Sequence, residues 1–315
     1  MSKEKVLITG GAGYLGSVLT KYLLGEGHQV TCLDNLRFHQ QTPLLFADDP
    51  NYEFVYGDAR DERVLGSLMS QHDTFIPLAA IVGVPACKSH SDDATTTNTN
   101  AIKALNDLRS TQQKLIYPNT NSGYGTQSGE RFCTEETPLE PISHYGKTKV
   151  ESEKILFSSG KNCVVLRLAT VFGISPRMRL DLLVNDFVYK AMTDRYIVMY
   201  EPHFNRNFVH IKDVARAFEH SMIHFEDMRN GAFNVGLDDA NLSKQELAQK
   251  IKKYFPNFEI IPREIGEDPD KRNYIVSSAK IREAGFTPRY TLDDGIRELR
   301  KGYSVLLKNN PYKND

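Results

Sequence analysis

The glycine-rich segment at residues 10–16 constrains the fold of this chain more than any other part of the sequence. It follows a short apolar run at residues 6–9 and precedes a helix-like stretch at 17–25. A second apolar run, at residues 30–33, ends at Asp34. Strand, glycine turn, helix, strand and acidic residue follow one another in this order in a βαβ unit that binds a dinucleotide.

The residues of this unit have separate physical roles. Gly10 permits a tight turn, Gly13 lets the backbone approach a pyrophosphate at the helix N-terminus, and Gly16 lets the helix pack close to the sheet. Asp34 can accept hydrogen bonds from a ribose 2′-hydroxyl and would repel a 2′-phosphate, which favours NAD over NADP. Arg37 lies nearby in sequence and is able to accommodate that phosphate, so NADP stays an alternative at this point.

Composition excludes several classes of protein. The 315 residues suffice for about two domains, and 39 basic against 40 acidic residues give no global argument for nucleic acid or a membrane surface as partner. The chain enters a predicted strand without a secretory signal, and its four cysteines, Cys32, Cys87, Cys133 and Cys163, form no metal-binding pattern. We expect free thiols, no metal site and a cytoplasmic protein.

Strand and helix patterns alternate as far as residue 168. After the first unit, strands are predicted at 54–56, 74–78, 114–117 and 163–168, and helices near 61–71, 92–111 and 145–158. The alternation predicts an α/β fold of the Rossmann type, a doubly wound parallel sheet. We expect a dinucleotide-binding domain at 1–168 with return segments at about 207–236. The expected second part, at 169–206 and 237–315, is a smaller mixed α/β lobe that binds substrate.

Tyr145 and Lys149 form a Tyr-x-x-x-Lys pair, which places both side chains on one face of a predicted helix. A neighbouring ammonium and an oxidised nicotinamide would lower the pKa of the phenol from its ordinary value of about 10. Tyr145 would then accept a proton from a substrate hydroxyl. An ordinary amphipathic helix is the alternative for this pair taken alone. Thr120, in the polar segment 118–125 after a predicted strand, can donate to the reacting oxygen.

Further motifs accompany these residues. They are Gly57-Asp58, Leu78-Ala79-Ala80, Pro141-x-Ser143-x-Tyr145-x-x-x-Lys149, the run 167–173 and Arg206-Asn207-Phe208-Val209-His210. Over nearly its whole length the chain resembles the extended short-chain dehydrogenases/reductases that act on nucleotide-sugars. The resemblance implies an NAD-dependent enzyme with Thr120, Tyr145 and Lys149 as catalytic residues, and a homodimer. Its implied cofactor contacts also include Gly10, Gly13, Tyr14, Leu15, Gly16, Asp34, Asn35, Asp58, Ala59, Leu78, Ala79, Ala80 and Asn98.

The second lobe would hold the nucleotide-sugar, whose pyrophosphate suits the bidentate geometry of arginine. The expected substrate contacts are Asn121, Ser122, Thr170, Arg177, Arg179, Asn185, Arg206 and Arg272. Arg206 and Arg272 match family positions that contact the nucleotide. Solvated loop charges are the alternative for Arg177 and Arg179, and a turn cap is the alternative for Asn185.

Departures from the family pattern narrow the reaction. Nucleotide-sugar 4,6-dehydratases carry Asp-Glu directly after the catalytic threonine, whereas Asn121 and Ser122 are not acids able to protonate a leaving hydroxyl. The segments 118–125, 174–187 and 266–272 resemble a branch that oxidises GDP-heptose at C4 in bacterial capsule pathways, which implies GDP-D-glycero-α-D-manno-heptose as substrate. A 4-epimerase, a 4-ketoreductase and a non-catalytic dinucleotide-binding protein stay as alternatives, although an intact Thr120, Tyr145 and Lys149 set argues against the last.

Overall fold

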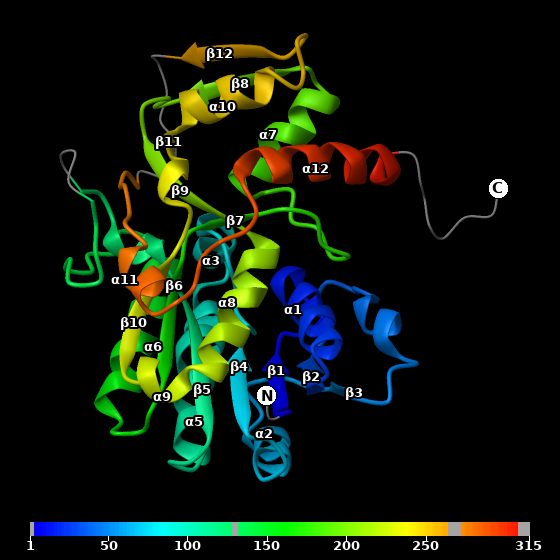
Figure 1. The fold of residues 1–315 in the computed structure, drawn as a ribbon, viewed down its shortest axis with the longest axis vertical. Helices are drawn as coiled ribbons and strands as arrows, with labels where there is room; N and C mark the ends of the chain where they lie inside the picture. Colours follow the sequence, from blue (N-terminus) through cyan, green and yellow to red (C-terminus); the bar gives the residue numbers. More distant parts are fainter. Residues whose placement is uncertain (1–2, 128–131, 264–271, 308–315) are drawn as a thin grey trace.

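A seven-stranded parallel sheet forms the centre of the molecule (Figure 1). The computed structural model describes residues 3–127, 132–263 and 272–307. The strand order is β10-β6-β5-β4-β1-β2-β3. The strands are β1 (Lys5–Thr9), β2 (Gln29–Asp34), β3 (Tyr52–Tyr56), β4 (Thr74–Pro77), β5 (Lys114–Thr120), β6 (Val164–Leu168) and β10 (Gly231–Val235). The predicted Rossmann-type α/β fold is therefore confirmed.

Helices cover both faces of this sheet. One face carries α1 (Tyr14–Gly25), α8 (Ile211–Ile223), α9 (Phe225–Met228) and α11 (Ala279–Glu283), and the other carries α2 (Glu62–Met69), α5 (Ala101–Leu108) and α6 (His144–Ser158). In β1, Val6 and Ile8 belong to the core on the first face, whereas Leu7 belongs to the core on the second. Burial on both faces explains why these strands read as continuous apolar runs.

Most predicted elements agree with the structure to within about two residues, and two elements differ in more than their end residues. The strand expected at 114–117 continues to Thr120, because residues 116–120 pair with β6. Pro118 has no backbone N–H to donate, but it is tolerated in β5. Because β5 pairs with β4 only at Lys114 and Leu115, no hydrogen bond to β4 is lost at Pro118. The helix expected at 92–111 divides into α4 (Ser91–Thr95), a π-helical turn η2 (Thr96–Asn100) and α5.

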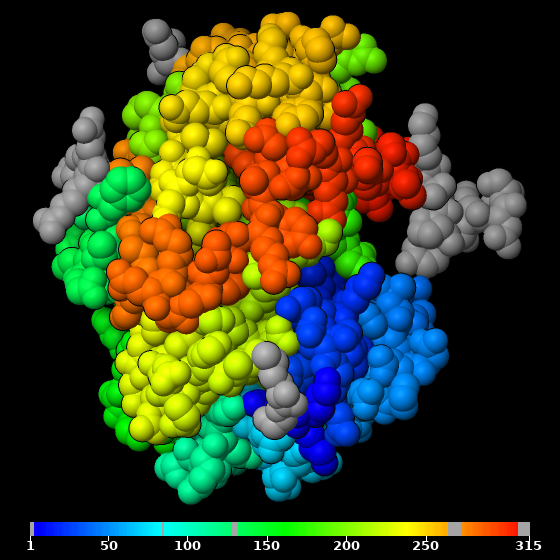
Figure 2. All heavy atoms as spheres, viewed as in Figure 1, coloured from blue at the N-terminus to red at the C-terminus, as the bar shows by residue number. Residues whose placement is uncertain are grey.

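The chain beyond Leu168 builds a smaller lobe with its own hydrophobic core. Its elements are β7 (Thr170–Phe172), α7 (Leu183–Met192), β8 (Tyr196–Tyr200), β9 (Asn205–His210), β11 (Asn241–Ser243), α10 (Lys244–Lys252), β12 (Glu259–Arg263) and α12 (Leu292–Leu306). Strands β11, β9 and β7 form one small sheet, and β12 pairs with β8. Figure 2 shows the C-terminal segments, in orange and red, lying across the surface between α8 and α10. Within the described ranges, no helix has both the length and the apolar character that crossing a membrane requires.

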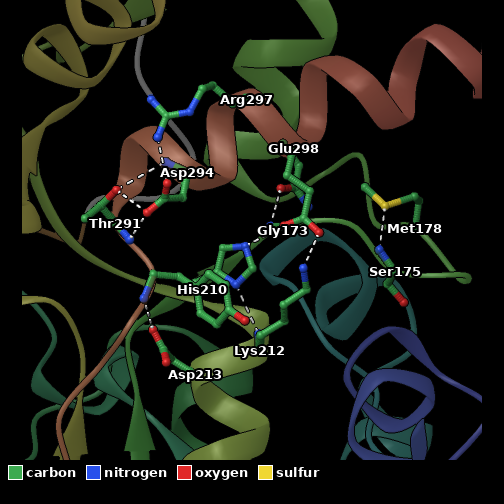
Figure 3. A network of polar contacts seen from close by, with 12 residues as sticks. Gly173, Ser175, Met178, His210, Lys212, Asp213, Thr291, Asp294, Arg297 and Glu298 are labelled. Atoms are coloured by element: carbon green, nitrogen blue, oxygen red, sulfur yellow. Dashed lines mark hydrogen bonds and ion pairs between the residues drawn. The ribbon is translucent and has the colours of Figure 1, made fainter. Parts of the chain in front are cut away.

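A polar network joins the lobe to α8 where β9 ends (Figure 3). His210 is fully buried, and its Nδ1 accepts a hydrogen bond from the backbone N–H of Lys212 at 3.2 Å. Its Nε2 lies 2.8 Å from Oε2 of Glu298 on α12. Asp213 accepts from the backbone N–H of Tyr290 at 2.8 Å, and the Tyr290 ring stacks on the imidazole. These contacts give His210 a structural role at the strand–helix junction.

The close packing of α1 against the glycine-rich turn leads to a first prediction. A Cβ on Gly16 would lie 2.4 Å from the Gly10 carbonyl oxygen and 2.6 Å from Gly11 Cα, and these backbone atoms cannot yield without moving the turn. We expect Gly16→Ala to lower the free energy of unfolding by about 2 kcal/mol. Gly25 is the last residue of the same helix, and a Cβ added there would meet no neighbouring atom within 4 Å. Gly25→Ala should therefore change stability by less than about 1 kcal/mol. Urea denaturation compares the two; equal losses would contradict the packing argument.

Candidate active site

A cavity lies at the carboxyl ends of the parallel strands, where the topology of such a sheet places its ligands. Segments that follow β1, β2, β3, β4 and β6 contribute to its wall, together with the end of β5, α6 and residues of the second lobe. The predicted site residues that line it are Gly10, Gly13, Tyr14, Leu15, Gly16, Asp34, Asn35, Asp58, Ala59, Leu78, Ala79, Ala80, Thr120, Ser122, Tyr145, Lys149, Thr170, Arg177, Arg179 and Arg272. The fold thus brings most of the predicted cofactor and substrate contacts to one cavity.

Four other predicted contacts, Asn98, Asn121, Asn185 and Arg206, are buried and do not belong to the residues that line this cavity. Asn98 lies in the π-helical turn, where its Oδ1 accepts from Ile81 N–H at 2.8 Å and its Nδ2 donates to the Ile81 carbonyl at 3.0 Å. Arg206 donates through Nη1 to the carbonyl oxygens of Asn205, at 2.9 Å, and of Arg272. Both side chains therefore support segments that do reach the cavity.

Asn185 has a similar supporting position behind the wall. Its Oδ1 accepts from the backbone N–H of Gly173 at 3.1 Å. Its Nδ2 donates to the Tyr14 hydroxyl at 3.2 Å and to the Arg179 carbonyl at 3.0 Å. From the sequence, Asn185 is a candidate to bond a phosphate or cap a turn; in the structure it links the glycine-rich turn to the segment that carries Arg179.

The glycine-rich turn has the shape that a dinucleotide requires. Gly10 adopts a positive φ of 73°, and a Cβ there would lie 2.6 Å from the Ala79 backbone nitrogen. Helix α1 begins after Gly13 without a side-chain cap or an acidic residue in its first turn. Its N-terminal backbone N–H groups are therefore suited to an anion such as a pyrophosphate. We conclude that the residues present fit the phosphates of NAD.

The acidic residue at the end of β2 is held in a fixed orientation. Asp34 is buried, and its Oδ2 accepts from Ala12 N–H at 3.0 Å. Its Oδ1 accepts from Leu36 N–H at 2.8 Å and from Gln40 Nε2 at 3.1 Å. Burial raises the pKa of this carboxyl, and the two backbone hydrogen bonds oppose that shift. Arg37, the residue considered for a 2′-phosphate, donates instead to Asp93 at 3.0 Å.

Tyr145 and Lys149 project from the first turns of α6, which Ser143 caps by accepting from Gly146 N–H at 3.1 Å. Lys149 is only 4% exposed, and its Nζ lies 4.0 Å from the centre of the Tyr117 ring. Burial lowers the pKa of Lys149 to about 7, so its ammonium is not a permanent charge in the absence of ligands.

The cations that lower the pKa of Tyr145 in the structure are not the one that the sequence predicts. Burial raises the pKa of its phenol, and the cations that oppose this shift are Arg179 and then Arg272. Sequence spacing assigned this effect to Lys149. Spacing along a helix identifies neighbours on that helix alone, whereas Arg179 and Arg272 come to Tyr145 from distant parts of the chain.

The Thr120 hydroxyl lies in a short chain of hydrogen bonds at the end of β5. It donates to Ser122 Oγ at 2.9 Å and accepts from Ser122 N–H at 3.1 Å, which starts the 3-10 turn η3 (Asn121–Tyr124). Arg272 Nη1 also donates to Ser122 Oγ. Ser122 thus connects Thr120 with a cation of the second lobe, whereas the Asn121 side chain is buried.

Sequence reasoning missed the buried ion pair that supports this arrangement. Glu153 Oε1 accepts from Arg167 Nη2 at 2.5 Å, and Glu153 Oε2 accepts from Arg167 Nε at 3.2 Å and from Asn119 Nδ2. Asn119 Oδ1 in turn accepts from Thr120 N–H at 2.8 Å. A signal existed, because Glu153 continues the spacing of four that joins Tyr145 and Lys149 on one face of α6.

Comparisons with known proteins agree with this geometry. Residues 6–236 match the family described as the NAD dependent epimerase/dehydratase family. The chain is 27% identical to a dTDP-glucose 4,6-dehydratase of Streptomyces niveus (95% of this chain, 92% of that protein) and 28% identical to a UDP-glucose 4-epimerase of Halalkalibacterium halodurans (90% and 91%). The solved structure of Thermus thermophilus UDP-glucose 4-epimerase with NAD shares the fold, with a TM-score of 0.81 and 22% identity over 95% of this chain and 99% of that one.

The burial of the Lys149 ammonium leads to a prediction about stability. Because its pKa falls from 10.5 to about 7 on folding, the unfolded chain binds more protons between these values, and stability should rise with pH across that window. We expect Lys149→Met to raise the free energy of unfolding of the cofactor-free protein at pH 7 by more than about 1 kcal/mol and to remove this rise. The matched control is Lys147→Met, which alters an exposed lysine of the same helix. Thermal unfolding across the pH window measures both; an unchanged pH dependence in Lys149→Met would refute the assignment.

Proposed function

The chain belongs to the NAD dependent epimerase/dehydratase family, and on this premise we propose that it oxidises a nucleotide-sugar at C4 of the sugar, with Tyr145 as the general base. The observation that carries the proposal is the presence of Thr120, Tyr145 and Lys149 in the same cavity as the glycine-rich turn. NAD bound in that cavity would supply the acceptor for the C4 hydride.

The proton chemistry belongs to residues of this chain. The phenolate of Tyr145 accepts the proton of the C4 hydroxyl while the C4–H bond breaks, so that the alcohol becomes a ketone. Thr120 hydrogen-bonds to the same oxygen and fixes its position. Ribose hydroxyls and the phenolate near Lys149 would stabilise the charged form of its side chain. The ammonium would then hydrogen-bond to the ribose of the cofactor.

The positions of the acidic residues at the site favour simple hydride exchange over dehydration. Within residues 3–127, 132–263 and 272–307, the carboxylates that line the cavity are Asp34, Asp58 and Asp181. Asp34 and Asp58 belong to the segments after β2 and β3, and Asp181 forms an ion pair with Arg179. Neither Asn121 nor Ser122, the residues after Thr120, is able to protonate a leaving hydroxyl.

We propose GDP-D-glycero-α-D-manno-heptose as the substrate and its 4-keto derivative as the product. This choice rests on the resemblance of residues 118–125, 174–187 and 266–272 to the branch that oxidises GDP-heptoses, although residues 266–271 lie outside the described ranges. Arg177, Arg179 and Arg272 line the cavity and offer cations to the diphosphate. Among the alternatives, a 4-epimerase has specific support from the 28% identity to a UDP-glucose 4-epimerase.

We also propose that the protein forms a homodimer through neighbouring helices of one sheet face. Leu108 of α5 is 41% exposed and Phe157 of α6 is 39% exposed, although both are large apolar side chains. A second copy of the chain would bury them, as expected for a self-complementary interface.

The role of Tyr145 is tested by Tyr145→Phe, which removes the proton acceptor and keeps the ring. We expect the rate of NADH formation with GDP-heptose, followed by its absorbance, to fall at least about 100-fold while NAD binding is retained. Tyr196→Phe, which alters an exposed tyrosine of β8, should keep the parent rate. Parent activity in Tyr145→Phe would end the proposal.

The direction of the reaction is tested by the balance of cofactor and sugar. A dehydrogenase forms NADH and the 4-keto sugar in equal amounts, so we expect both in mass spectra of a stoichiometric reaction of NAD-loaded protein with GDP-heptose. Conversion of the sugar to its C4 epimer without NADH would favour the epimerase, and consumption of added NADH or NADPH with a 4-keto sugar would favour the reductase.

A further inference from the structure

We propose that the Arg179–Asp181 pair sets the proton affinity of Tyr145. The charge of Arg179 favours the deprotonated phenol, and the charge of Asp181 opposes that effect. The pair would thus act as a positioning element for the general base, and the inference rests on the proposed function of Tyr145.

The pair lies on the wall of the cavity that also holds Tyr145. Arg179 donates through Nε to Asp181 Oδ1 at 3.2 Å and through Nη2 to Asp181 Oδ2 at 2.5 Å. Both side chains face Gly83, where an added Cβ would lie 3.9 Å from Arg179 Nη2 and from Asp181 Oδ2. Gly83 directly precedes helix α3 (Val84–Ser89), which carries Cys87. Because Cys87 belongs to the small hydrophobic cluster against which Tyr145 packs, this helix connects the pair with the phenol.

The backbone around Arg179 is held in place from two sides. The Arg179 carbonyl accepts from Asn185 Nδ2 at 3.0 Å. Ser175, earlier in the same segment, donates through Oγ to the Tyr14 carbonyl at 2.7 Å, and its backbone N–H donates to Met178 Sδ at 3.2 Å (Figure 3). Since Asn185 also holds Gly173, the segment is tethered both to α7 and to the glycine-rich turn. The guanidinium therefore has a defined location relative to the cavity.

The charged and titratable groups near Tyr145 come from four parts of the chain. Arg179 of the tethered segment, Arg272 and Tyr274 of the segment that returns to the cavity, and Cys87 of α3 act on its phenol. Asp181 of the tethered segment and Lys149 of α6 line the same cavity. Arg179 is the strongest of the influences that lower the pKa of the phenol against the effect of burial. It also lowers the pKa of the Cys87 thiol, which burial raises to about 11. A guanidinium stays charged at every relevant pH, whereas Lys149 does not.

The two members of the pair do not cancel at the phenol. The Asp181 side chain is 62% exposed, whereas the Arg179 side chain is 18% exposed. Solvent screens an exposed charge more strongly than a buried one, so the arginine acts on the cavity more than the carboxylate does. Removal of either member should therefore move the proton affinity of Tyr145, in opposite directions.

The experiment measures that affinity in two ways on the NAD-loaded protein. The first is the pH titration of tyrosinate absorbance, from which the titration of Tyr145→Phe is subtracted to isolate one residue; it requires no sugar. The second is the pH profile of NADH formation with GDP-heptose. We expect Arg179→Gln to raise the apparent pKa of Tyr145 by roughly one unit, Asp181→Asn to lower it, and Arg179→Lys to restore most of the parent value.

The matched control is Arg177→Gln. Arg177 lies two positions away on the same segment, but its guanidinium stacks on the Phe38 ring at 4.5 Å and donates to the Met178 carbonyl. We expect this variant to leave the Tyr145 titration unchanged. Shifts of the same sign in Arg179→Gln and Asp181→Asn would identify a structural role and overturn the inference, as would no shift in either. If the parent protein forms no NADH from GDP-heptose, the proposed function fails, and the titration still decides the inference.

Discussion

The buried ion pair between Glu153 and Arg167 is the constraint on which the geometry of the site depends. Two charges removed from water are stabilising only when their remaining hydrogen-bonding groups are satisfied. Here Arg167 also donates to the Tyr124 hydroxyl at 3.1 Å and to the Glu135 carbonyl at 3.0 Å. Because Glu153 lies on α6 and Arg167 on β6, the pair fixes the register of α6 against the sheet. Tyr145, two turns earlier on α6, is thereby fixed against the carboxyl edge of the sheet.

A second set of contacts holds the smaller lobe over the glycine-rich turn. The Tyr14 hydroxyl donates to the Gly173 carbonyl at 2.8 Å, and Asn185 bonds both residues. His210 lies against Gly173, since a Cβ on that glycine would approach the imidazole Nε2 to 3.1 Å. The segment that carries Arg179 thus begins at a junction shared by the glycine-rich turn and the smaller lobe. The cavity across this junction is where we propose that a nucleotide-sugar meets the dinucleotide.

The parts of the fold and site that the sequence predicts are those encoded by local periodicity and turn chemistry. The glycine spacing, Asp34 and the strand–helix alternation determine where the sheet presents its ligand edge, and the structure has that sheet. What the sequence does not reveal is the direction in which a polar side chain points. Asn185 and Arg206 are polar, as Arg179 is, yet they are buried behind the wall of the cavity. Tertiary packing, and not residue type alone, decides which polar side chains are buried. Similarly, no local pattern brings Arg179 to Tyr145. Only the spacing of Glu153 on α6 carried a signal that sequence reasoning passed over.

The central claim is that the C4 hydrogen of a sugar leaves as hydride inside this cavity while Tyr145 takes the proton. Its most direct test uses GDP-heptose deuterated at C4 and NAD-loaded protein in a single turnover, followed by mass spectrometry of the cofactor released on denaturation. We expect one deuterium on the reduced nicotinamide and none in the solvent. Deuterium that exchanges into water, or that stays on the sugar while the sugar is converted, would contradict it.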